Sequence, residues 1–183
     1  MEISLIELKK ENYDYHELHY VYDSDEHYKV TASDVGEGFS FDFVREKLNK
    51  PYHHDSYDVL FSESWENVSA FGIKDDESNE IIAYLELSRE EWNDRLHITN
   101  LLVKEDYRGK GFGKLLVDKA KEIAVSEDRR IITLETQSCN IPAIDFYKKQ
   151  GFVFAGTNIY FYSNVDIDED EVMIEMAYLY WIF

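Results

Sequence analysis

Short runs of apolar residues follow one another in the middle of the chain, each with the length of a β-strand. The runs at 68–74, 81–87 and 96–103 are rich in apolar and β-branched residues and predict three strands. The segment at 75–79 contains only Asp, Glu, Ser and Asn, and it predicts a turn between the first two strands. We therefore expect neighbouring strands of one sheet in this part of the chain.

The period of the apolar residues changes after residue 110. Apolar residues at helical spacing predict a helix over 111–126. A strand at 131–135 and a second helix at 142–150 follow, with Pro142 in the first helical turn and Gly151 as the stop signal. The first helix is therefore expected to cross over between the two strands that flank it.

The two ends of the chain give weaker patterns. Residues 3–8 predict a first strand, and residues 39–48 predict a helix because four apolar residues can share one face. Those four residues are Phe39, Phe43, Val44 and Leu48. Two last strands are expected at 152–162 and 173–183, and the acidic loop 166–171 between them is expected to be a solvated hairpin tip.

This order of elements predicts an α/β fold, with a mixed sheet and flanking helices. A chain of 183 residues is long enough for one well-buried domain, so we expect a single domain over 1–183. Residues 1–65 would supply an N-terminal strand and helices on the substrate side, and residues 66–183 would form the core.

The composition excludes some classes of protein. An aromatic content of 15% argues for a folded chain, and a net charge of −19 argues against nucleic acid as a partner. The negative charge suits a cationic ligand or serves solubility alone. The single cysteine, Cys139, excludes an internal disulfide framework, and we interpret it as structural. Neither a signal peptide nor a membrane-spanning apolar run is evident, so a cytoplasmic protein without membrane association is expected.

A glycine-rich and basic turn stands out in this acidic chain between the strand at 96–103 and the following helix. It consists of Arg108, Gly109, Lys110, Gly111, Phe112, Gly113 and Lys114. Backbone N–H groups at a helix N-terminus bind phosphate, and glycines let the backbone approach it closely. The turn therefore predicts contact with a phosphorylated cofactor, with a plain helix-capping turn as the alternative.

A second motif lies thirty residues further on, from Asn140 through Ala143 and Tyr147 to Gly151-Phe152. In this order, with a strand between them, the two motifs resemble the GNAT family of acyl-CoA-dependent N-acyltransferases. The resemblance covers roughly residues 66–183. Within the family, Glu86-Leu87, Trp92-Asn93, the run 134–140 and the aromatic segment 177–181 are similar to streptothricin acetyltransferases.

The resemblance implies a central, splayed mixed sheet flanked by helices and a site for acetyl-CoA. It implies that backbone N–H groups near Leu102 and Val103 polarise the thioester carbonyl. The amides of the turn 108–114 would hold the pyrophosphate. Asn140 would contact the pantetheine arm or its waters and Ala143 would also bind the cofactor, although Asn140 is equally suited to capping the helix that follows it.

Tyr147 is the residue that the resemblance assigns as proton donor to the departing CoA thiolate, with a core aromatic as the alternative. Many relatives have a carboxylate at the positions of Thr99 and Asn100, and this chain has none there. Glu86 and Glu135, on neighbouring strands, are therefore the candidates for the general base that frees the amine. Each is also a candidate substrate anchor.

Other residues carry weaker signals. Trp92 and Asn93 precede the cofactor strand and are candidates for the acceptor site, with edge packing as the alternative. The acidic, tyrosine-rich segment 13–28 is a second candidate, because carboxylates and aromatic faces both hold cations. The histidines lack zinc-ligand spacing, so no metal is expected.

The sequence thus predicts an acetyl-CoA-dependent N-acetyltransferase that acts on a primary amine of a cationic small molecule by direct attack on the thioester. The resemblance points to streptothricin, with its β-lysine amine as the acceptor. A polyamine or protein-amine acetyltransferase and a non-catalytic acyl-CoA-binding module are the alternatives. A homodimer that pairs the last strand, 173–183, between copies stays open.

Overall fold

A computed structural model describes residues 2–180 of the chain. These residues divide into two compact units, which are described separately. The first contains residues up to 20, residues 56–134 and residues from 178 onward, and the second contains residues 21–55 and 135–177. Whether the whole chain acts as a single domain stays a prediction.

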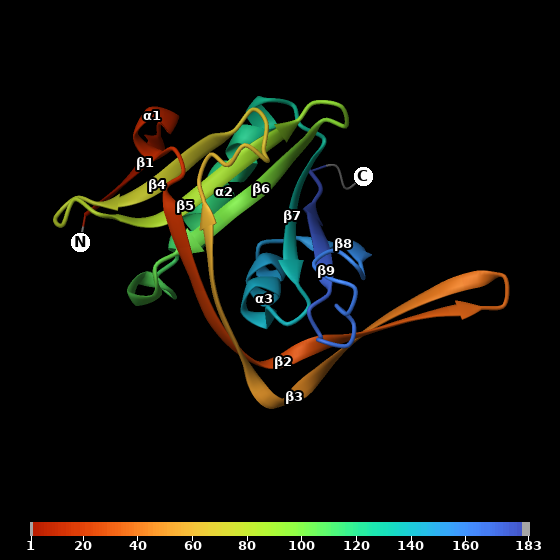
Figure 1. The fold of residues 1–183 in the computed structure, drawn as a ribbon. Coiled ribbons are helices and arrows are strands. Elements are labelled where there is room, and N and C mark those ends of the chain that lie inside the picture. The colour runs from red at the N-terminus through yellow and green to blue at the C-terminus, as the bar shows by residue number, and fades with distance from the viewer. Residues whose placement is uncertain (1, 181–183) are drawn as a thin grey trace. The chain divides into compact units, whose positions relative to one another are not determined.

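A sheet forms the first unit. It contains β1 (Ile3–Leu8), β4 (Ser69–Asp75), β5 (Ile81–Glu90), β6 (Arg95–Val103) and the start of β7 (Ile131–Gln137), in that order across the sheet. Figure 1 shows these strands side by side. Neighbours are antiparallel except β6 and β7, which pair in parallel over Arg95–Ile98 and Ile131–Leu134. This mixed sheet confirms the predicted fold class.

Helix α2 (Phe112–Ser126) packs against β5 and β6 and makes the parallel crossover from β6 to β7. Its buried face consists of Phe112, Leu116, Val117, Ala120, Ile123 and Ala124, as the helical spacing predicted. Side chains point alternately to the two faces of a strand. The side chains on one face of the central strand β5 therefore pack against α2, and those on the other face pack into a separate core cluster. That cluster contains Leu8, Leu18, Leu60, Phe61, Ala70, Tyr84 and Leu102.

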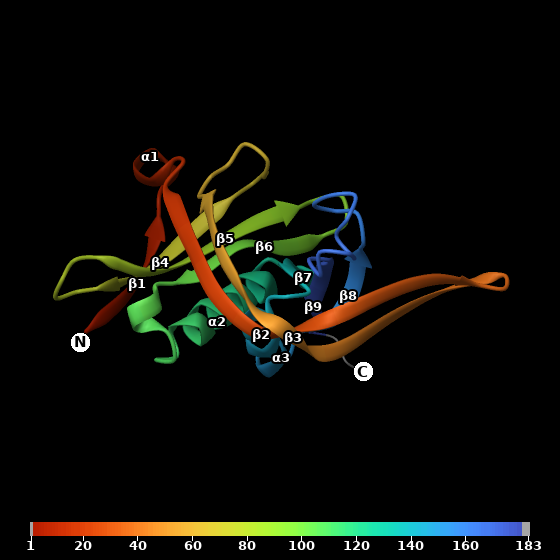
Figure 2. The same ribbon diagram turned by 60° about the horizontal axis from the view of Figure 1, so that its bottom comes forward.

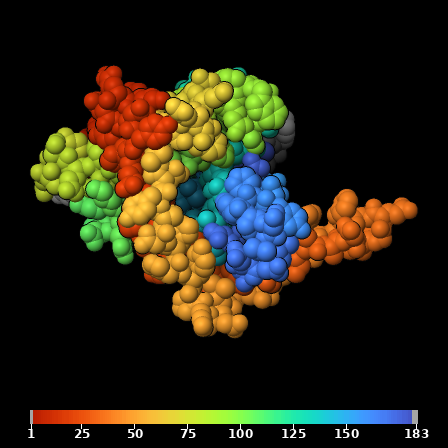
Figure 3. Space-filling model, viewed as in Figure 1, coloured from red at the N-terminus to blue at the C-terminus, as the bar shows by residue number. Residues whose placement is uncertain are grey.

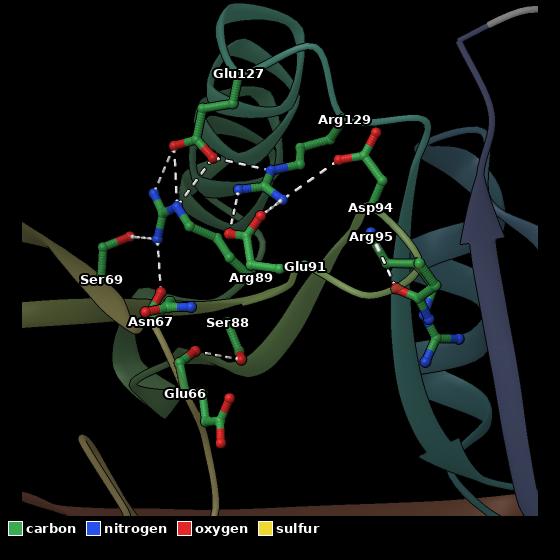
Figure 4. A network of polar contacts seen from close by, with 11 residues as sticks. Glu66, Asn67, Ser69, Ser88, Arg89, Glu91, Asp94, Arg95, Glu127 and Arg129 are labelled. Carbon is green, nitrogen blue, oxygen red and sulfur yellow. Dashed lines mark hydrogen bonds and ion pairs between the residues drawn. The ribbon is translucent and has the colours of Figure 1, made fainter.

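A network of ion pairs ties the end of α2 to the turn between β5 and β6 (Figure 4). Arg89 contacts Glu127 with both its Nε and Nη2, with a shortest distance of 2.7 Å. Arg129 is 9% exposed and pairs with Glu127, Glu91 and Asp94 at 3.2, 2.9 and 3.4 Å. The network therefore holds the start of β6 in place.

The second unit contains the outer part of a long hairpin, α3 (Ile141–Lys149), β8 (Val153–Asn158) and most of β9 (Met173–Tyr178). The hairpin is formed by β2 (Glu17–Val35) and β3 (Gly38–Val59), which Figure 2 shows running side by side. Its turn contains Gly36 at φ +60°, a conformation that favours glycine in two-residue hairpin turns. Strands β8 and β9 pair antiparallel, and the loop between them lies on the face of the molecule visible in Figure 3, coloured blue.

The predicted helix at 39–48 is wrong, because these residues lie within strand β3. The same residues also fit a strand, with Phe39, Phe41 and Phe43 on one side, and pairing with β2 selects that period. The expected substrate-side helices of the N-terminal part are likewise replaced by this hairpin, apart from the short helix α1 (Lys10–Tyr13).

The remaining predicted elements are present, with ends shifted by a few residues. Of the strand predicted at 173–183, residues 181–183 lie outside the described part of the chain. Within residues 2–180, no helix is long and apolar enough to cross a membrane.

Candidate active site

The glycine-rich turn joins β6 to α2 through a short 3₁₀ helix at Glu105–Tyr107. Gly109 and Gly111 have φ values of +74° and +89°, which L side chains rarely adopt. A Cβ placed on either glycine would meet no other atom of the described residues within 4 Å, apart from its chain neighbours. The turn therefore follows a backbone path that requires glycine and leaves its outer side open.

The N-terminus of α2 begins at this turn. Gly111 is the N-cap residue, and among the described residues no side chain caps the helix there. The first backbone bond of the helix runs from the N–H of Leu115 to the carbonyl of Gly111, at 3.2 Å. The preceding N–H groups, of residues 112–114, point away from the helix with its positive dipole end behind them. This arrangement fits the pyrophosphate of acetyl-CoA.

The basic side chains of the turn have structural contacts of their own. Arg108 donates from Nε to the carbonyl oxygen of Val103 at 3.1 Å, and Lys110 lies 4.9 Å from the centre of the Tyr107 ring. Lys114 forms an ion pair with Asp118 one helical turn further on. The backbone of the turn, more than its side chains, is thus available to an anion.

Leu102 and Val103 lie at the end of β6 that leads into this turn. Their positions pair with Tyr84 and Ala83 of β5, and the Leu102 side chain is buried in the core cluster. The backbone here is therefore held in place by β5 on one side, as a rigid oxyanion site requires.

Glu86 is fully buried, at 0% exposure, in the middle of β5. Its Oε1 accepts a bond of 2.5 Å from the backbone N–H of Phe61. Its Oε2 accepts bonds of 2.6 Å from the Thr99 hydroxyl and 3.0 Å from the Asn100 amide. A buried carboxylate needs such donors, and here three of them converge on it.

A β-bulge in β6 explains how two consecutive residues reach the same carboxylate. Glu86 pairs with Asn100 and Leu87 pairs with Ile98, so Thr99 is the extra residue of the pair. Consecutive side chains of a regular strand point to opposite faces, whereas a bulge redirects one of them. Sequence reasoning noted the missing carboxylates at 99 and 100, but it could not show that both residues bind Glu86.

Two routes lead from Glu86 toward solvent. Thr99 is partly exposed and donates directly to the carboxylate. The Tyr20 hydroxyl donates to Oδ1 of Asn100 at 2.7 Å, and Tyr20 is also partly exposed. Thr99 and Asn100 were not among the predicted site residues, and Tyr20 was included only as part of the candidate segment 13–28, because nothing local in the sequence links them to Glu86.

Glu135 has a different environment from Glu86. It is exposed, lies on β7 within the second unit, and accepts a hydrogen bond from the Tyr162 hydroxyl of the β8–β9 loop. It is thus accessible to water, where Glu86 is not.

Tyr147 projects from α3 and is 8% exposed. Its ring contacts Phe146 and Phe152 edge-on, with centroid distances of 5.1 and 5.4 Å. Burial raises the pKa of the Tyr147 phenol, and the negative charge of Glu135 raises it further. The phenol is therefore protonated at neutral pH.

Asn140 caps the helix that carries Tyr147. Its Oδ1 accepts a bond of 3.1 Å from the backbone N–H of Ala143, so the capping role considered for Asn140 is present. Asn140 and Ala143 thereby fix the start of α3, one helical turn before the phenol.

Trp92 and Asn93 lie in the turn between β5 and β6. Trp92 is 83% exposed, and Asn93 bonds Glu90 and the backbone N–H of Arg95. At roughly 3.3 Å a residue, the strand between them and Val103 is about 30 Å long. The structure therefore places them at the opposite end of β6 from the glycine-rich turn.

The acidic loop 166–171 connects the antiparallel strands β8 and β9, as predicted for a hairpin tip, but it is solvated only in part. Asp166 is 1% exposed and accepts bonds from the backbone N–H groups of Tyr162 and Ser163 at 3.0 and 2.7 Å. Asp170 pairs with Lys29 at 2.7 Å. Within residues 2–180 no group of three or more His, Cys, Asp or Glu side chains is placed to hold a metal ion.

The structure thus groups the predicted site residues by unit. Glu86, the end of β6 and the turn 108–114 belong to the first unit, and Asn140, Tyr147 and Glu135 belong to the second. The first unit thus contains a helix N-terminus suited to an anion after a bulged strand, and the second contains a buried tyrosine on α3, two features expected of an acyl-CoA-dependent transferase.

Comparison with known proteins agrees with this geometry. Residues 39–152 match the family described as Acetyltransferase (GNAT) family, so the chain belongs to the GNAT acetyltransferases. The match covers more than half of the 183 residues.

Relatives within the family are more specific. The chain is 33% identical over 132 residues to a streptothricin acetyltransferase of Escherichia coli, covering 72% of this chain and 71% of the relative. It is 34% identical over 126 residues to streptothricin acetyltransferase A of Bacillus subtilis (strain 168), covering 67% and 70%. A Bacillus anthracis str. Ames structure in complex with acetyl coenzyme A shares the fold, with a TM-score of 0.73, 23% identity and 99% of both chains covered.

These findings define the protein as an acetyl-CoA-dependent N-acetyltransferase. The α2 N-terminus described above fits the cofactor of that family.

Proposed function

We propose that this N-acetyltransferase acetylates a primary amine of streptothricin, at the β-lysine group. The observation that carries the proposal is the identity of 33% and 34% to two streptothricin acetyltransferases over 72% and 67% of the chain. The net charge of −19 supports a polycationic acceptor, because such a surface attracts cations.

The proposed mechanism is direct attack of the amine on the thioester, for which bound acetyl-CoA supplies the activated acetyl group. Backbone N–H groups at Leu102 and Val103 would stabilise the negative charge that develops on the carbonyl oxygen. Tyr147 would donate its proton to the departing thiolate. The phenol is protonated at neutral pH, as a donor must be, although burial raises its pKa and makes it a weaker acid.

The amine must lose a proton before it attacks. An amine with a pKa near 10 is mostly protonated at pH 7, and freeing it costs about 4 kcal/mol. We propose that Glu86 receives this proton through Thr99, because the buried carboxylate itself is out of contact with solvent. The Thr99 hydroxyl would accept the proton of the amine, directly or through water, while passing its own proton to Glu86.

The proposal is tested by acetyl-CoA consumption with streptothricin, spermidine and a lysine peptide as separate acceptors. We expect turnover to be fastest with streptothricin and a monoacetylated product by mass spectrometry. Turnover only with spermidine or only with the peptide would replace streptothricin by a polyamine or a protein amine. Binding of acetyl-CoA without transfer to any amine would instead indicate a non-catalytic acyl-CoA-binding module.

Tyr147→Phe tests the proton donor. We expect kcat to fall about a hundredfold or more, the size of a lost general acid, with the affinity for acetyl-CoA unchanged. Tyr160→Phe is the matched control, because Tyr160 is 64% exposed on the β8–β9 loop of the same unit. Equal rates for the two variants would exclude Tyr147 as the donor.

A further inference from the structure

Three aromatic rings gather in the second unit, outside the residues assigned to the reaction. Tyr22 of β2 stacks on His54 of β3 with centroids 4.7 Å apart and planes 16° apart. Tyr52 lies 6.0 Å from Tyr22 and 6.2 Å from His54. All three side chains are partly exposed, so the group, here called the tyrosine cluster, is within reach of a ligand.

A polar chain runs along one edge of the tyrosine cluster to a carboxylate. The Tyr22 hydroxyl donates to Oε1 of Gln137 at 3.0 Å, and Nε2 of Gln137 donates to Oε1 of Glu171 at 3.1 Å. Glu171 is partly exposed. The folded acidic loop fixes its position, since its backbone N–H donates to the carbonyl of Asp166 at 2.9 Å.

The neighbouring carboxylate is engaged differently. Asp170 already pairs with a lysine, Lys29, at 2.7 Å, whereas Glu171 receives the neutral amide of Gln137. The charge of Glu171 is therefore less compensated by these contacts than that of Asp170.

The protonation states make the tyrosine cluster attractive to cations. Burial raises the pKa of Tyr22 and of Tyr52, and the Cys139 thiol and the Glu171 carboxylate nearby raise both further, so both phenols are neutral. Burial lowers the pKa of His54, which leaves its imidazole neutral near pH 7.5. Neutral rings next to one carboxylate form an environment that stabilises an organic cation, with the stacked pair Tyr22–His54 offering its outer faces.

We infer that the tyrosine cluster and Glu171 bind a second, non-reacting cationic group of the acceptor. Rings and a carboxylate stabilise the charged form of an amine, whereas the amine that attacks must lose its charge. A group that stays charged is therefore the suitable occupant. The inference rests on the proposed acetylation of an amine, and it specifies acceptors with at least two cationic groups as the substrate class.

Glu171→Gln tests the inference. Its steady-state kinetics are measured with butylamine, which carries a single cation, and with the polycations spermidine and streptothricin. We expect KM for the two polycations to rise about tenfold, the size of one lost charge contact. We expect kcat, KM for butylamine and KM for acetyl-CoA to stay within about twofold. Glu169→Gln is the matched control, because Glu169 is an exposed carboxylate on the same loop.

The rings are tested separately by Tyr52→Leu and Tyr52→Phe. The Leu variant removes the ring and should raise KM for the polycations, and the Phe variant keeps the ring and should restore most of the affinity. Circular dichroism spectra and melting temperatures of both variants identify a loss that is due to misfolding.

Several outcomes would overturn the inference. Equal rises of KM for butylamine and the polycations would show a general effect, and equal rises for Glu171→Gln and Glu169→Gln would show long-range charge alone. If the wild type transfers acetyl to no amine, the proposed function fails. The inference can then still be tested by measuring the binding of spermidine to the wild type and to Glu171→Gln by calorimetry. Equal affinities of the two proteins would refute it.

Discussion

Replacing the buried carboxylate of Glu86 by an amide should lower both stability and activity. The Glu86 carboxylate accepts from the backbone N–H of Phe61 and from the side chains of Thr99 and Asn100. An amide has only one acceptor oxygen. If that oxygen keeps the bonds to Thr99 and Asn100, the new NH₂ group faces the N–H of Phe61, and two donors confront each other.

The size of the loss follows from these contacts. One hydrogen bond to a charged acceptor is lost and a buried N–H is left without its partner, which together cost about 2–3 kcal/mol. For a chain of this length, 1 kcal/mol shifts the melting temperature by about 2–4 °C. Glu86→Gln should therefore melt about 4–12 °C below the wild type.

The catalytic effect is measured on the same protein. At pH 7.5 we expect kcat to fall about a hundredfold or more, since the amide cannot accept the proton of the amine. The rate of the variant should rise about tenfold per pH unit toward the pKa of the amine, because solvent then removes the proton instead.

Glu80→Gln is the control for both measurements. Glu80 has an exposed side chain, at 62%, and lies 3.8 Å from Lys104, so its loss should change the melting temperature by less than about 2 °C. An unchanged or raised melting temperature for Glu86→Gln would mean that desolvation of the carboxylate outweighs its three hydrogen bonds. A near-normal rate at pH 7.5 would refute its role as the base.

Three further predictions concern the turn, the core and the ion-pair network. Gly111→Val should raise KM for acetyl-CoA at least about tenfold in steady-state assays. The backbone at φ +89° strains a β-branched residue by about 1–2 kcal/mol, and the valine side chain would enter the open side of the turn. Gly38→Ala is the control, because φ is not positive at Gly38, and it should leave KM unchanged. Burial lowers the pKa of His97 to about 4 from 6.5, so the unfolded chain binds this proton more tightly, and about 3 kcal/mol of stability should be lost as the pH falls from 6.5 to 4. Urea unfolding should show a flatter pH dependence for His97→Gln, and an equal slope would contradict the assignment. Arg129→Lys should lower the melting temperature at low salt, since lysine cannot keep the several ion pairs of the guanidinium. In 0.5 M NaCl the difference in melting temperature between variant and wild type should be smaller. Equal melting temperatures at low salt would show that the network is dispensable.

Much of the fold could be predicted because its elements are locally encoded. The helical spacing over 111–126 and the glycines of the preceding turn depend on residues close in sequence, and the structure reproduces both. The helix predicted at 39–48 was wrong because local spacing alone does not decide its structure. Its apolar residues fit both periods, and only pairing with β2, the preceding strand of the hairpin, selects the strand.

The site was predictable only in part. The motif residues of the cofactor turn and Tyr147 could be proposed from the sequence because their spacing is local, and their roles stay predictions. Trp92 and Asn93 were proposed because they precede the cofactor strand, but strand β6 separates them from the turn by its full length.

The sequence by itself thus determined the family, the cofactor and the elements that flank the glycine-rich turn. Only the tertiary structure decided which polar groups serve Glu86, since a one-residue bulge at Thr99 brings two side chains to a carboxylate on the next strand. It likewise brought Tyr22 and Glu171 to a common polar chain through Gln137. Local periodicity specifies helices and strands, whereas strand register and long-range packing determine which distant side chains meet.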